Sequence, residues 1–189
     1  DALTAANLVD LTKRSTFNYD AISTNPIFTT ATATNNVFQV IDSTLGLPAT
    51  LAPALTDGRI AFYTSINATI APRYRINGFY NSTTSSIPIY LPGEIMLIKA
   101  EAMARTNNLT GALAELNKVI TKTAAADLFK VGAGLTASTA STSSEILDEI
   151  YKNRCIELYM SGLKLEDMRR FGRPVSERKR NFFPYPFRE

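Results

Sequence analysis

The chain has 189 residues, of which 45% are hydrophobic, and a net charge of +3, which suits one domain or two small lobes. It contains no His, no Trp and a single cysteine, Cys155. This inventory excludes disulfides within the chain, metal sites built on His or several Cys, and Ser–His or Cys–His nucleophile pairs. Cys155 stands among helix-forming residues, so we expect it to be a small buried hydrophobic side chain.

The first part of the chain, residues 1–86, lacks long helical periodicity and is punctuated by X-Pro pairs. We predict a loop-rich segment that faces a ligand, with short strands at Val37–Ile41 and Ile60–Ile66. The chain opens at Asp1 without a basic and apolar leader, so we expect this end to result from truncation or processing.

Residues 87–189 are expected to be helical. Pro92 opens a predicted helix that ends at Asn107, and a second follows from Leu109 to Ile120 with apolar residues at spacings of three and four. Small residues twelve apart, Ala100 and Ala112, are typical of a tetratricopeptide helix pair. Charged residues interrupt the apolar run in the first helix, which indicates a packed helix and not a membrane span.

A polar loop, residues 132–144, separates this pair from two more predicted helices. Thr142 and Glu145 form a capping box that opens a helix reaching Ser161, and Gly162 suits its left-handed end. A shorter helix is predicted for Leu163–Phe171, before an extended tail that contains Pro184 and Pro186.

Charged residues share a face with apolar neighbours in the last two predicted helices. A buried charge is tolerated only when it is paired and hydrogen-bonded. We therefore predict a structural ion network and expect no catalysis from it. Its members are Arg154, Glu157, Asp167, Arg169 and Arg170.

Two stretches resemble the SusD/RagB family of nutrient-binding lipoproteins. Residues 90–119, YLPGEIMLIKAEAMARTNNLTGALAELNKV, are similar to its tetratricopeptide-like helix pair, and residues 150–173, IYKNRCIELYMSGLKLEDMRRFGR, to its Arg, Glu-Leu, Gly and Asp-x-Arg-Arg pattern. The ending FFPYPFRE is similar to its closing Pro-x-Pro-x-x-Glu segment. Asp57-Gly58-Arg59 resembles its Asp-Pro-Arg element, with Gly58 in place of Pro.

The resemblance implies a mainly α SusD-like fold, with a tetratricopeptide-like pair, further helices, loop-rich segments and a few short strands. It also implies a lipid-anchored protein that faces the exterior of the outer membrane. Such a protein binds oligosaccharide without catalysis or cofactor and delivers it to a SusC-like TonB-dependent transporter. Family members are typically longer, so an amino-terminal part with the lipidated cysteine is expected to precede this chain.

Ligand contacts are predicted in the irregular segment before the helices. Aromatic rings stack on sugar faces, while amides and guanidinium groups bind hydroxyls. Tyr90 lies in the same region as the candidates. These are Tyr63, Arg73, Tyr74, Arg75, Asn77, Tyr80 and Asn81.

Several alternatives remain open from the sequence. A RagB-like protein would capture peptides on the same scaffold, and a tetratricopeptide-like interaction module would have no small ligand of its own. A glycosidase would need a carboxylate pair, for which Asp57, Glu94, Glu101 and Glu115 are available. The basic run from Arg169 to Arg180 could meet phosphate, but interspersed acids favour pairing within the chain.

Overall fold

The computed structural model describes residues 1–31, 42–66, 68, 74–174 and 177. Most of the regular structure in these residues is helical, so the predicted mainly α fold class is confirmed. The helices are α1 (Ala2–Asn7), α2 (Pro26–Ala31), α3 (Gly58–Tyr63), α4 (Pro92–Arg105), α5 (Leu109–Thr121), α6 (Ser143–Glu157) and α7 (Lys164–Arg170), with short 3-10 turns η1 (Gly78–Tyr80) and η2 (Ala124–Ala126).

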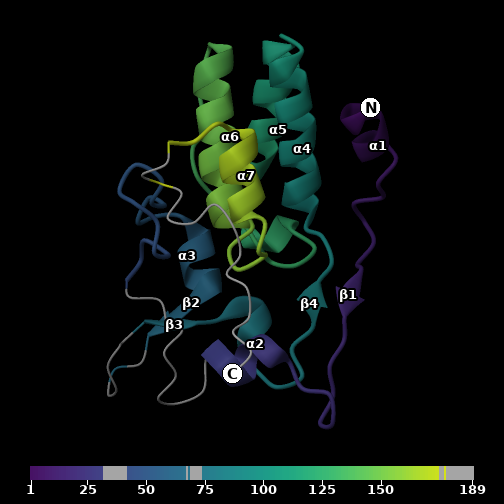
Figure 1. Ribbon diagram of the computed structural model, residues 1–189, viewed down its shortest axis with the longest axis vertical. Coiled ribbons are helices and arrows are strands. Elements are labelled where there is room, and N and C mark those ends of the chain that lie inside the picture. Colours follow the sequence, from purple (N-terminus) through teal and green to yellow (C-terminus); the bar gives the residue numbers. More distant parts are fainter. Residues whose placement is uncertain (32–41, 67, 69–73, 175–176, 178–189) are drawn as a thin grey trace, which may run out of the picture.

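The strands form two small antiparallel pairs. Strand β1 (Thr16–Phe17) pairs with β4 (Ile87–Pro88), so that Phe17 lies opposite Ile87. Strand β2 (Thr64–Ile66) pairs with β3 (Tyr74–Ile76), with Ser65 opposite Arg75. In Figure 1 the long helices α4, α5 and α6 stand side by side, and the strand pairs lie below them.

The three long helices pack around one apolar core. Small residues let α4 and α5 approach closely, since Ala100 and Ala112 are both fully buried. Larger side chains fill the remaining space, among them Leu97, Leu116 and Ile150. The tetratricopeptide-like pair is therefore present, and α6 packs against both of its helices.

The predicted helix boundaries hold closely except at the end of α6. The capping box is formed, because Thr142 accepts from the Glu145 backbone N–H while the Glu145 carboxylate accepts from Thr142. The helix ends at Glu157, before the predicted Ser161. Met160 and Gly162 both have positive φ, so the chain turns sharply there.

The predicted strand Ile60–Ile66 is wrong in its first half. Asp57 caps a helix over Gly58–Tyr63 by accepting from the Arg59 N–H, and only Thr64–Ile66 is a strand. A local cap has overridden the strand preference of the aromatic and β-branched residues. The predicted strand Val37–Ile41 lies outside the described residues.

None of the helices in the described part of the chain has both the length and the apolar composition that a membrane span requires.

A glycine at the start of α4 makes room for a buried acid of α6. A Cβ on Gly93 would overlap the Glu157 carboxylate, with 2.6 Å to its Cδ. We predict that Gly93→Ala lowers the free energy of unfolding by about 3 kcal/mol, because Glu157 cannot move away without leaving its partners. Urea denaturation measures this change.

Gly111→Ala is the matched control in α5. Its new Cβ would meet the side-chain ends of Met103 and Asn108, and the bond at risk is the single cap bond from the Gly111 N–H to Asn108. We expect a change of about 1 kcal/mol or less. Equal losses for the two variants would show that the close approach of Gly93 to Glu157 has no special importance.

Candidate functional site

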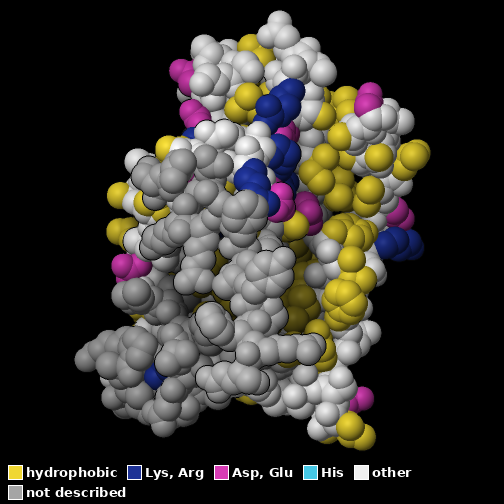
Figure 2. Space-filling view, in the orientation of Figure 1, with side chains coloured by type: hydrophobic (Ala, Val, Ile, Leu, Met, Phe, Trp, Pro, Cys, Tyr) yellow, Lys and Arg dark blue, Asp and Glu magenta, His cyan; other side chains and the backbone are white. Residues whose placement is uncertain are grey.

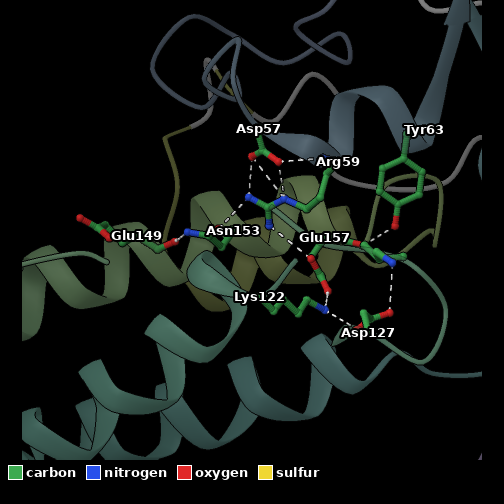
Figure 3. Close-up of polar contacts among 9 residues, drawn as sticks. Asp57, Arg59, Tyr63, Lys122, Asp127, Glu149, Asn153 and Glu157 are labelled. Atoms are coloured by element: carbon green, nitrogen blue, oxygen red, sulfur yellow. Dashed lines mark hydrogen bonds and ion pairs between the residues drawn. The ribbon is translucent and has the colours of Figure 1, made fainter. Parts of the chain in front are cut away.

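Glu157 is the centre of a buried ion cluster that Figure 3 shows. Its side chain is fully buried at the end of α6. Arg59 Nη1 donates to its Oε2 at 3.3 Å, and Lys122 Nζ donates to its Oε1 at 2.5 Å. The carboxylate therefore has one cation from the loop-rich segment and one from the end of α5.

The partners of Glu157 are bonded in turn. Arg59 also bonds Asp57, at 2.7 Å from Nη2, and the side-chain oxygen of Asn153. Burial lowers the pKa of the Arg59 guanidinium, but its hydrogen bonds and charge interactions with Asp57 and Glu157 outweigh burial, and the net shift is upward. Lys122 also bonds Asp127 at 2.7 Å. This cluster is closed and paired, which suits a structural role.

Tyr63 joins the same cluster through the backbone. Its hydroxyl donates to the Glu157 carbonyl at 2.6 Å, and its side chain is fully buried. Burial raises the pKa of Tyr63 well above its ordinary value. Tyr63 thus anchors α3 to the end of α6.

A second ion cluster links α4, α6 and α7. Arg154 Nε donates to Asp167 at 2.8 Å, and Asp167 also accepts from Arg170. Arg170 and Arg105 both bond Glu101. The residues of the two clusters hold the orientation of the helices.

This arrangement meets the sequence expectation only in part. Arg154 and Asp167 contact each other as expected, with Arg170 beside them. Glu157 differs, because its bonded cations are Arg59 and Lys122. Arg169 also differs, since it pairs with Glu166 at the exposed surface of α7. The Asp57-Gly58-Arg59 motif was the available signal, but spacing alone did not connect it to α6.

A groove lies beside these clusters, below the long helices. Its volume is about 490 Å³, and its walls come from β1, β4, the start of α2, η1 and the turn between α6 and α7. Figure 2 shows hydrophobic side chains in a hollow beside strands β1 and β4. The aromatic lining residues are Phe17, Tyr19, Tyr63, Phe79, Tyr80, Tyr90 and Tyr159.

The aromatic rings differ in how much surface they offer. Phe17 is 58% exposed, and Tyr90 and Tyr159 are half-buried, so these rings can meet a ligand. Burial raises the pKa of Tyr159 to about 12. A tyrosine hydroxyl is protonated at neutral pH in any case, so it can donate a hydrogen bond. An apolar groove with several hydroxyl groups can bind a ligand that has flat apolar faces and polar edges.

The model of one protein family, the SusD family, matches residues 44–185. The chain belongs to the SusD family. A search of curated proteins gave no match. Members of this family are generally non-enzymatic nutrient-binding proteins of the outer membrane, lipid-anchored and associated with SusC-like transporters.

In this SusD-family protein the expected ligand residues divide into separate groups. Tyr63 and Tyr80 line the groove but are only 0% and 3% exposed, so neither offers a ring face to a ligand. Their burial corrects the expectation that both are stacking platforms. Both belong to the packed apolar interior.

The other expected ligand residues that the structure describes do not line the groove. Tyr74 and Arg75 lie on β3, and Asn77 follows it. Asn81 is exposed, and its side chain accepts from Ser85. Arg73 lies outside the described residues.

Groove residues that the sequence did not single out are Phe17, Tyr19, Phe79 and Tyr159. No pattern marked them, because they come from three segments far apart in the chain. The described part of the chain contains no cluster of three or more His, Cys, Asp or Glu that could hold a metal ion.

The buried pair of Arg154 and Asp167 yields a stability prediction. Arg154→Ala should lower the free energy of unfolding by about 3 kcal/mol, because it leaves Asp167 buried with fewer bonds. Glu166→Ala removes a surface pair with Arg169 and should change stability by about 0.5 kcal/mol or less. Urea denaturation of both variants provides the test. Similar losses would argue against a special contribution from the buried pair.

Proposed function

We propose that this protein binds an oligosaccharide in the aromatic groove and delivers it to a SusC-like TonB-dependent transporter. It would do so at the exterior face of the outer membrane, held there by a lipid anchor. The aromatic lining of the groove carries the proposal. Family membership supports nutrient binding, and the exposed rings and hydroxyl groups favour a sugar among nutrients.

The groove suits stacking from more than one side. Phe17 lies on β1, Tyr90 follows β4, and Tyr159 lies in the turn after α6. A pyranose has an apolar face that packs on a ring and equatorial hydroxyls that bind polar groups at the edge. Each ring contributes about 1 kcal/mol in such a contact. Several modest contacts together give weak but useful binding at a cell surface.

The charges around the groove favour binding without hydrolysis. A glycosidase needs two carboxyl groups across the scissile bond. Among the described lining residues, Glu94 is the only carboxylate. Asp57 and Glu101, two other candidates from the sequence, are bonded to arginines in the ion clusters.

Binding to a panel of soluble oligosaccharides, followed by calorimetric titration, tests the proposal. We predict that Phe17→Ala with Tyr159→Ala weakens binding about thirtyfold, the loss expected from two stacking contacts. Tyr74→Ala is the matched control, because Tyr74 lies on β3 outside the groove. It should leave the affinity unchanged.

Other binding results would support the alternative functions. Binding to short peptides and to no oligosaccharide would favour peptide capture. No binding to either would favour an interaction module. An equal loss of affinity with Tyr74→Ala would show that the binding site is not the groove.

A further inference from the structure

The buried carboxylates of the described residues share one property. Each is bonded to an arginine or a lysine, as expected for charges taken out of water. They are Asp57, Glu101, Asp127, Glu157 and Asp167.

Glu94 differs from this set. It is half-buried in the first turn of α4 and lines the aromatic groove, yet it forms no ion pair with any described residue. Its apolar neighbours in the groove include Leu91, Leu158 and Leu163. The groove therefore contains a carboxylate that lacks a directly bonded cation.

The charges nearest to Glu94 compensate it incompletely. Arg154 of α6 acts on it at longer range, but Arg154 is itself bonded to Asp167 of α7. Burial raises the pKa of Glu94, and the effect of Arg154, which lowers it, is smaller. A positive charge entering the groove would stabilise the ionised carboxylate.

We infer that Glu94 is a cation subsite of the groove and that it takes a ligand with an ammonium group. This inference rests on the proposed function, so the ligand class is an oligosaccharide that carries a free amino sugar. The ammonium group would donate to the Glu94 carboxylate in a charge-assisted hydrogen bond. The rings of Tyr90 and Tyr159 line the same groove, and aromatic faces also attract cations.

The test compares two sugars on the same protein. The probes are a tetrasaccharide of glucosamine and its fully N-acetylated form, titrated at about pH 6, where amino groups are protonated. The measured quantity is the ratio of their affinities, because contacts made by both sugars then cancel. We expect Glu94→Gln to reduce the preference for the amino form about tenfold, the loss expected for one charge-assisted bond.

Glu166→Gln is the matched control. It removes the same charge from the chain, but its side chain is 65% exposed and lies outside the groove. The preference for the amino form should stay at the wild-type value. An equal change in both variants would mean that overall charge, and not Glu94, sets the preference, and would overturn the inference.

Two further outcomes separate this inference from the proposed function. If the acetylated sugar binds and Glu94→Gln leaves the ratio unchanged, the cation subsite is overturned while glycan binding stands. If neither these sugars nor any other oligosaccharide binds, the cation subsite and the proposed function are both contradicted.

Thermal unfolding of the Glu94→Gln variant provides a second readout. The Nη1 atom of Arg154 is buried and has no hydrogen-bond partner among the described atoms. The competing explanation is therefore that Glu94 stabilises the charge of Arg154 and binds no ligand. A clear loss of stability with an unchanged sugar ratio would identify that role and overturn the subsite. Wild-type stability with a reduced ratio is the result we expect.

Discussion

The carboxylate of Glu157 is fully buried, and the residues around it are arranged to tolerate it. Removing a charge from water costs several kcal/mol unless bonded partners replace the solvent. Arg59 and Lys122 provide this replacement from two segments, 98 and 35 residues away in sequence. Gly93 leaves the space that the carboxylate occupies. The loop-rich segment is therefore held against the helices by a charge that would otherwise be stranded.

The burial of Glu157 also determines where the groove lies. Glu157 ends α6, and the turn that follows supplies one wall through Leu158, Tyr159 and Met160. Tyr63, bonded to the Glu157 carbonyl, lines the groove from α3. The structural cluster and the ligand groove are thus built from adjacent residues, and a change in the first should alter the shape of the second.

Local patterns were sufficient to predict the helices from α4 to α7, but not the short helices α1, α2 and α3 or the partners of Glu157. Apolar spacing and the Thr142–Glu145 capping box are short-range signals, and both are realised in the structure. The contact between Arg59 and Glu157 depends on how distant segments pack, which spacing does not encode. The groove shows the same limit. Tyr63 lies in the expected region, but sequence could not tell that its ring is buried, because an aromatic residue in irregular chain suits either a core or a surface.

A double-mutant cycle on Arg59 and Glu157 tests this account most directly. Urea denaturation of Arg59→Ala, Glu157→Gln and the combined variant gives the coupling free energy between the two side chains. We predict a coupling of about 2 kcal/mol or more, because either single change leaves the other group buried with one charged partner fewer. Additivity within about 0.5 kcal/mol would contradict the claim that this pair holds the loop-rich segment on the helices.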